Sequence, residues 1–189
     1  MRKIVHFVHT SLDGNIEGPE GEFDWPAMGP ELSAYSFSQL ERADTLLYGR
    51  PVWEMMAGYW PNAESLSDDP HDLKFAPIWR STPKVVFSRT LTDPGHGARL
   101  IDGTDLVGEV TALKSEAGKD MLLMGGSTLA AELTAHGLID EYQVVVHPVV
   151  LGGGKPLFPE PAKRFDLDLV DSRTFDSRSV LLRYRPATR

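Results

Sequence analysis

Short apolar, strand-like runs alternate with helix-like stretches up to about residue 150, and only strand-like runs follow. The earlier strand-like runs are 3–9, 45–48, 84–88, 98–101, 121–124 and 142–150. The helix-like stretches between them are 30–42, 52–59, 105–117 and 127–136. The C-terminal runs 165–175 and 179–185 flank a turn at 176–178. This order predicts an α/β fold with a central mixed, mostly parallel sheet and an antiparallel C-terminal strand pair.

Two segments break the alternation. Residues 11–29 are rich in glycine, proline and acidic side chains and predict a long loop, and residues 61–83 form the least regular part, with a short helix around Leu73. Neither segment has the composition of a linker, so we expect a single domain over residues 1–189.

Composition excludes several classes of protein. The chain has no cysteine, which removes disulfides, thiolate metal sites and a cysteine nucleophile. Its net charge of −8 argues against a nucleic-acid or anionic-membrane binder. No apolar run reaches the length of a membrane span, and the apolar run at the N-terminus is too short for a signal peptide, so we expect a cytoplasmic protein. The six histidines are scattered, and we expect no metal site.

Glycine-rich and basic residues follow three of the predicted strands. They are Gly49-Arg50, Ser88-Arg89 and Gly125-Gly126-Ser127-Thr128, the last at the start of a helix. Ligands of open α/β sheets bind beyond the carboxyl ends of the strands, and a helix N-terminus attracts phosphate. The alternative is that the glycines form a tight turn and the arginines are solvated. Neither a Walker motif nor a Gly-x-Gly-x-x-Gly fingerprint is present.

Taken in order, six motifs carry a resemblance to a known family. They are residues 11–16 (SLDGNI), 47–50 (LYGR), 86–91 (VFSRTL), 124–129 (MGGSTL), 137–142 (GLIDEY) and 148–154 (PVVLGGG). The chain resembles the reductase domain of the bifunctional deaminase-reductase of riboflavin biosynthesis, within the dihydrofolate-reductase-like superfamily. The resemblance extends from about residue 3 to residue 185 and implies NADPH as the cofactor. The deaminase half is absent.

The resemblance implies cofactor roles for three groups of residues. Val8, His9 and Ile16 would lie against the nicotinamide, His9 through its backbone. Ser88 and Arg89 would flank the adenosine 2′-phosphate. The pyrophosphate would be held by two helix starts, formed by Gly49, Arg50, Pro51 and Val52, and by Gly125, Gly126, Ser127, Thr128 and Leu129. Many relatives have threonine where this chain has Val52, so a side-chain hydroxyl is missing there.

Reduction also requires a proton. The candidate donors are Asp13, Asp24, Glu31 or a bound water, with Asp13 and Glu31 as the predicted catalytic residues and Asp24 and Trp25 as predicted substrate-binding residues. Each has a structural alternative. Asp13-Gly14 favours a turn by itself, Glu31 suits the positive end of a helix, and Trp25 suits a core.

We therefore expect an NADPH-dependent reductase of a pyrimidine or pterin-like heterocycle, of the 5-amino-6-(5-phosphoribosylamino)uracil reductase type. The alternatives are a dihydrofolate reductase and a non-catalytic NADPH-binding protein. A substrate phosphate would need a further cation, and the candidates are Arg42, Lys155 and Arg164. Relatives commonly form homodimers, and an apolar surface over Val144–Leu151 would serve that contact.

Overall fold

An eight-stranded sheet runs through the computed structural model, which describes residues 1–160 and 164–187. Its order is β5-β4-β3-β6-β1-β7-β10-β9. The strands from β5 to β7 are parallel to one another, and β10 is antiparallel to both of its neighbours. Their bounds are β1 Ile4–Thr10, β3 Ala43–Gly49, β4 Lys84–Phe87, β5 Arg99–Ile101, β6 Asp120–Leu123, β7 Glu141–Val146, β9 Leu167–Phe175 and β10 Ser179–Pro186. The predicted fold class is confirmed.

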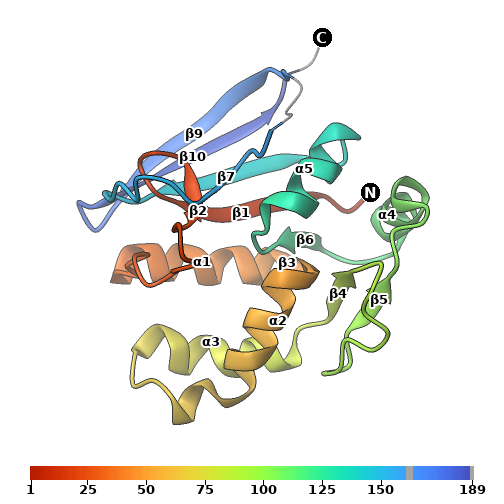
Figure 1. The fold of residues 1–189 in the computed structure, drawn as a ribbon, viewed down its shortest axis with the longest axis horizontal. Coiled ribbons are helices and arrows are strands. Elements are labelled where there is room, and N and C mark those ends of the chain that lie inside the picture. The colour runs from red at the N-terminus through yellow and green to blue at the C-terminus, as the bar shows by residue number, and fades with distance from the viewer. Residues whose placement is uncertain (161–163, 188–189) are drawn as a thin grey trace.

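Helices cover both faces of this sheet (Figure 1). On one face lie α1 (Pro30–Arg42), α2 (Arg50–Tyr59) and α3 (Pro70–Ser81), and on the other α4 (Leu106–Ser115) and α5 (Ser127–Ala135). Each face has its own buried cluster. Phe37, Trp53 and Trp79 belong to the first cluster, and Leu113 and Leu133 to the second. None of the helices in the described ranges is long and apolar enough to cross a membrane.

The two segments predicted to be irregular contain regular structure. Within residues 11–29, β2 (Asn15–Glu17) pairs with β8 (Lys155–Pro156) in a small second sheet. Within residues 61–83, a 3-10 helix, η1 (Trp60–Ser65), precedes the twelve-residue α3. The Asp69 carboxylate caps α3 by accepting a hydrogen bond from the amide of His71, and Pro70 occupies the first turn.

The strand predicted over residues 142–150 is shorter in the structure. β7 ends at Val146, and Pro148 has no amide with which to continue the ladder. β7 lies between β1 and β10, and Val145 is fully buried, so this strand is not the exposed apolar surface that we expected over Val144–Leu151. The exposed apolar side chains of this region are Val150, Leu169 and Val170.

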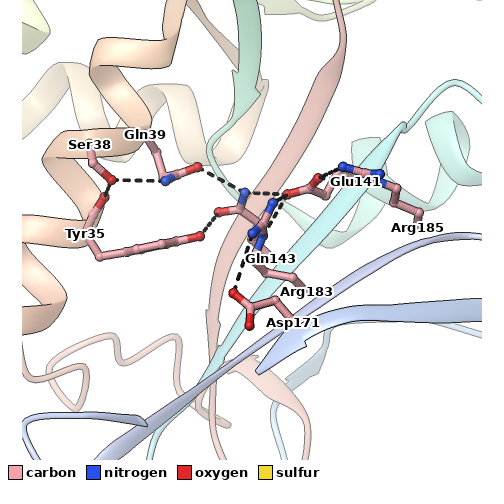
Figure 2. A network of polar contacts seen from close by, with 8 residues as sticks. All are labelled: Tyr35, Ser38, Gln39, Glu141, Gln143, Asp171, Arg183 and Arg185. Atoms are coloured by element: carbon pink, nitrogen blue, oxygen red, sulfur yellow. Dashed lines mark hydrogen bonds and ion pairs between the residues drawn. The ribbon is translucent and has the colours of Figure 1, made fainter. Parts of the chain in front are cut away.

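A polar network fastens α1 to the sheet, as Figure 2 shows. Gln143 on β7 is its centre. Its Oε1 accepts a hydrogen bond from the Tyr35 hydroxyl at 2.9 Å, and its Nε2 donates to Gln39 Oε1 at 3.0 Å and to Glu141 Oε1 at 2.7 Å. The network therefore fixes α1, and with it the predicted site residue Glu31, relative to β7.

Glu141 carries the charge of this network. Its buried carboxylate accepts hydrogen bonds from Arg183 at 2.8 Å and from Arg185 at 3.3 Å. Burial by itself would raise the pKa of Glu141, but hydrogen bonds from Gln143 and Arg183 outweigh burial and lower it. Glu141 is therefore a paired, ionised group at neutral pH.

Candidate active site

The carboxyl ends of the parallel strands meet at one edge of the sheet. Gly49 at the end of β3 is in register with Phe87 at the end of β4, and Thr10 of β1 with Val146 of β7. Ser88-Arg89 and Gly125-Gly126 follow β4 and β6 at the same edge. The structure thus brings together the three glycine-rich or basic strand ends of the sequence.

Two helices begin side by side at this edge, α2 after Gly49 and α5 after Gly126. A Cβ atom on Gly49 would lie 3.3 Å from Cβ of Leu129, and a Cβ atom on Gly126 would lie 3.2 Å from Cγ2 of Val52. Gly126 has φ +87°, a backbone conformation that favours glycine. The first turns of α2 and α5 are therefore in contact.

Neither of these helix starts has a capping side chain. By contrast, Asp69 caps α3, Asp105 caps α4, and Asp176 accepts hydrogen bonds from the first-turn amides of α1. In addition, Ser127 in the first turn of α5 is 1% exposed, and its Oγ has no hydrogen-bond partner in the described residues. Free amides, the positive ends of two helix dipoles and a buried hydroxyl suit an anion such as a pyrophosphate.

Arg50 reaches from the start of α2 to the loop after β4. Its Nη1 donates to Thr90 Oγ1 and its Nε to Glu54 Oε1, both at 2.7 Å. In the same loop, Ser88 Oγ accepts a hydrogen bond from the amide of Leu91. Arg89 is exposed and has no ion pair or hydrogen bond with any described residue. The loop after β4 thus contains one cation, Arg89, and is contacted through Thr90 by a second, Arg50 of α2.

The residues predicted to face the nicotinamide lie where β1 passes β2 and β7. Val8 and Ile16 are buried together with Leu157, and Val144 packs against them. His9 Nδ1 lies 2.8 Å from Nε2 of His147, which follows β7. Burial is the main cause that lowers the pKa of His9 to about 3 and that of His147 to about 4, so both imidazoles are neutral at neutral pH.

Of the predicted substrate-binding residues, the structure brings only Trp25 to this pair. The Trp25 ring lies 5.7 Å from that of His147 and 5.5 Å from that of Phe23. Asp24 is exposed. The sequence did not single out His147 as a site residue, because it lies 138 positions from His9 in the chain. Its place near the end of the strand predicted over residues 142–150 was the available signal.

Backbone amides donate hydrogen bonds to the carboxylates of both predicted catalytic acids, Asp13 and Glu31. The Asp13 carboxylate accepts hydrogen bonds from Leu151 at 3.1 Å and Gly152 at 2.9 Å. A hydrogen bond from Ser11, followed by these amides, lowers the pKa of Asp13 to about 2. Asp13 therefore has no proton to give at neutral pH, and its observed role is to hold the glycine loop that follows β7.

Glu31 is engaged with the turn between β9 and β10. Its Oε2 accepts a hydrogen bond from the amide of Asp176 at 2.5 Å, while the Asp176 carboxylate accepts from the amides of Glu31 and Leu32. This reciprocal pair agrees with the structural alternative for Glu31, a negative charge at the positive end of a helix.

The three candidate phosphate cations do not gather at this edge. Arg42 ends α1 and lines a small cavity with Lys3 and Asp120, at the opposite edge of the sheet. Arg164 is largely exposed beside Asp166. Lys155 lies in β8, opposite Glu17 of β2 and two residues before Leu157, which packs with Val8 and Ile16.

A larger cavity opens beside α2. It encloses about 460 Å³ between the segment 23–28, the end of α2, η1 and the start of α3. Its lining residues are Phe23, Pro26, Met28, Met55, Met56, Tyr59, Trp60, Asp69, His71 and Asp72. Phe23 connects this cavity to Trp25 and so to the histidine pair.

Known proteins resemble this chain over its whole length. A sequence model of the RibD C-terminal domain family matches residues 2–181. The uncharacterized protein YyaP of Bacillus subtilis (strain 168) is 39% identical over 186 residues, which cover 97% of this chain and 94% of YyaP. A proposed riboflavin biosynthesis protein from Shewanella sp. PV-4 has a similar structure, with a TM-score of 0.73, 25% identity and full coverage of both chains. Dihydrofolate reductase from Enterococcus faecalis, complexed with NADP(H), shares the fold, with a TM-score of 0.63, 14% identity and coverage of 98% and 97%.

Proposed function

This chain belongs to the RibD C-terminal domain family, and we propose that it is an NADPH-dependent reductase of a pyrimidine or pterin-like heterocycle, of the riboflavin-pathway type. The observation that carries the proposal is that α2 and α5 begin side by side without capping side chains. The buried Ser127 hydroxyl in the first turn of α5 also has no hydrogen-bond partner among the described residues. These groups fit the pyrophosphate of a dinucleotide, and Arg50, Ser88 and Arg89 fit its 2′-phosphate.

When bound, NADPH supplies the hydride, and the protein supplies position and charge. In the proposed arrangement, the nicotinamide lies over Val8 and Ile16, and the neutral pair His9–His147 borders it. Because Asp13 and Glu31 are occupied by amides, we propose that a water delivers the proton.

A substrate panel tests this function. NADPH oxidation would be followed with 5-amino-6-(5-phosphoribosylamino)uracil, with its phosphate-free counterpart and with dihydrofolate. Turnover of either uracil supports the proposal. Turnover of dihydrofolate alone would favour the first alternative, and tight NADPH binding without any turnover would favour a non-catalytic binding protein.

Replacing Arg89 with alanine should abolish most of the preference for NADPH over NADH. One arginine–phosphate contact corresponds to a preference of roughly 10- to 150-fold, so the variant should lose about that factor for NADPH and little for NADH. Arg50→Ala should act likewise if it binds the 2′-phosphate and should weaken both cofactors if it binds the pyrophosphate. Titration calorimetry with both cofactors measures this. Arg99→Ala removes an exposed charge from β5 and serves as the control. Equal binding of NADH and NADPH by the unmodified protein would contradict the assignment.

We also propose that the protein is a homodimer. With β7 in the interior of the sheet, the surface that fits this contact is the edge strand β9, where Leu169 and Val170 are exposed. Light scattering should give twice the chain mass of 20.9 kDa at micromolar concentration, and Leu169→Lys should reduce it to the monomer mass. A monomer mass for the unmodified protein would refute the dimer.

A further inference from the structure

The cavity beside α2 has an unusual distribution of charge. Aromatic, methionine and proline side chains form most of its lining, and its ionisable residues apart from Tyr59 are Asp69, His71 and Asp72 at the start of α3. None of its ten lining residues is lysine or arginine. Lys74, on the same helix, places its Nζ 4.0 Å over the ring of Phe37 and is not part of the lining.

The histidine in this lining does not supply a positive charge at neutral pH. Burial lowers the pKa of His71, despite the opposing effect of Asp72 and Asp69. Its Nδ1 lies 2.8 Å from the Ser33 hydroxyl, and its ring lies against those of Phe37 and Phe75. The Tyr59 hydroxyl donates to Asp72 Oδ2 at 2.6 Å. The charged groups of the lining at neutral pH are thus two carboxylates.

Large apolar side chains at the mouth of the cavity are exposed. Phe23 is 42% exposed and Met55 is 46% exposed, although both lie next to a cavity lined by other apolar groups. A flat aromatic ligand would cover both of them and stack against Trp60, which is typical of small-molecule sites.

A chain of ring contacts links the cavity to the position proposed for the nicotinamide. Phe23 lines the cavity and contacts Trp25, Trp25 contacts His147, and His147 is paired with His9. The segment 23–28 therefore borders the cavity on one side and the histidine pair on the other.

We propose that this cavity is the substrate site and that it takes an amino-substituted aromatic heterocycle without a phosphate group. This inference rests on the proposed function and narrows its substrate class. Asp69 Oδ1 already accepts from the amide of His71 and Asp72 Oδ2 from the Tyr59 hydroxyl, so amino or amidine-like groups of the ligand would donate to Asp69 Oδ2 and Asp72 Oδ1. Both carboxylates repel a phosphate. Arg42 and Arg164 lie away from this edge of the sheet, and neither Lys155 of β8 nor Arg178, whose charge acts on His147, is part of the cavity lining.

The test compares ligands that differ only in charge. Calorimetry on the NADPH-saturated protein would use 5-amino-6-(ribosylamino)uracil and its 5-phosphate, with 2,4-diamino-5-benzylpyrimidine as a cationic probe. We expect the phosphate-free compound to bind at least roughly tenfold more tightly than the phosphate, and the diaminopyrimidine to bind as well. Tighter binding of the phosphate would overturn the proposal.

A double variant, Asp69→Asn with Asp72→Asn, removes both charges and keeps side-chain size. Asparagine is as good a helix N-cap as aspartate, so α3 should still form. Affinity for the diaminopyrimidine should fall roughly 10- to 100-fold, and the discrimination against the 5-phosphate should shrink. Asp68→Asn, which changes an exposed neighbour outside the lining, is the matched control. Equal diaminopyrimidine affinity in the double variant and the control would also overturn the proposal.

NADPH titration of the same variants keeps the two proposals apart. If the protein fails to bind NADPH, the proposed function fails whatever the cavity binds. If NADPH binds normally but the affinities of the three ligands do not depend on the charges of Asp69 and Asp72, only the inference about the cavity fails.

Discussion

Replacing Gly126 with valine is expected to raise the Kd for NADPH at least roughly 100-fold while the chain still folds. Gly126 has φ +87°, and its missing Cβ would lie 3.2 Å from Val52 Cγ2, in the contact between the starts of α2 and α5. A branched side chain there must push the two helix starts apart. The loss of about two amide–phosphate contacts then gives the expected factor, since each hydrogen bond to a charged group contributes about 1.5–3 kcal/mol.

Strain at a positive φ destabilises a protein by itself, so the variant needs a control with the same strain at a different place. Gly137 follows the other end of α5, has φ +65° and has no atom within 4 Å of its missing Cβ. Gly137→Val should lower the melting temperature by a similar few degrees and leave NADPH binding unchanged. If Gly126→Val binds NADPH as the unmodified protein does, Gly125-Gly126 is only a tight turn.

The elements that local signals specify were predicted well from the sequence. The predicted helix 30–42 coincides with α1, because Pro30 at the first position and Glu31 beside it mark its start. The three glycine-rich or basic strand ends were also found. Each follows a short, mostly buried strand, and the parallel sheet brings all of them to one edge.

Helix α3 extends well beyond the short helix predicted around Leu73, because the signals at its ends read as interruptions. Asp69-Pro70 is a capping residue followed by a first-turn proline, yet the same dipeptide is common in loops. Pro77 lies inside the helix, where local preference opposes it. Tertiary packing decides the outcome. Trp79 is 1% exposed, donates to the Tyr48 hydroxyl at 3.1 Å and stacks on Trp53.

The roles of the candidate catalytic residues were decided by partners far along the chain. Glu31 meets Asp176 at a separation of 145 residues, and Asp13 meets Leu151 and Gly152 at 138 and 139. Such pairings leave no trace in local composition. A single sequence can therefore nominate an acid but cannot tell whether backbone amides already occupy it.

Replacing Glu141 with glutamine should reduce the free energy of unfolding by about 2–4 kcal/mol, a fall of roughly 5–15 °C in Tm. The buried carboxylate joins Arg183, whose side chain is 17% exposed, to Gln143 and the α1 network (Figure 2). Without the carboxylate, the guanidinium of Arg183 stays largely buried without its main partner. Arg185, at 51% exposed, can turn to solvent, which limits the loss.

The pH dependence of this loss shows whether the charge of Glu141 or the hydrogen-bond geometry of its side chain stabilises the fold. The folded pKa of Glu141 lies below the ordinary value of 4.5, so its charge stabilises the fold above that pH, and the contribution disappears as the pH falls through the folded pKa. The difference in unfolding free energy between the unmodified protein and Glu141→Gln should be constant near neutral pH and shrink below about pH 4.5. Other acids titrate in both proteins and cancel in the difference.

Asp171→Asn is the matched control for this experiment, because the Asp171 carboxylate lies 3.6 Å from the same Arg183 but is 49% exposed. An exposed ion pair contributes about 0–1 kcal/mol, so this variant should unfold close to the unmodified protein. Urea unfolding of all three proteins from about pH 7 to about pH 3 measures both quantities. A loss for Glu141→Gln that does not change with pH would mean that hydrogen-bond geometry, and not the buried charge, fastens α1 and Glu31 to the sheet.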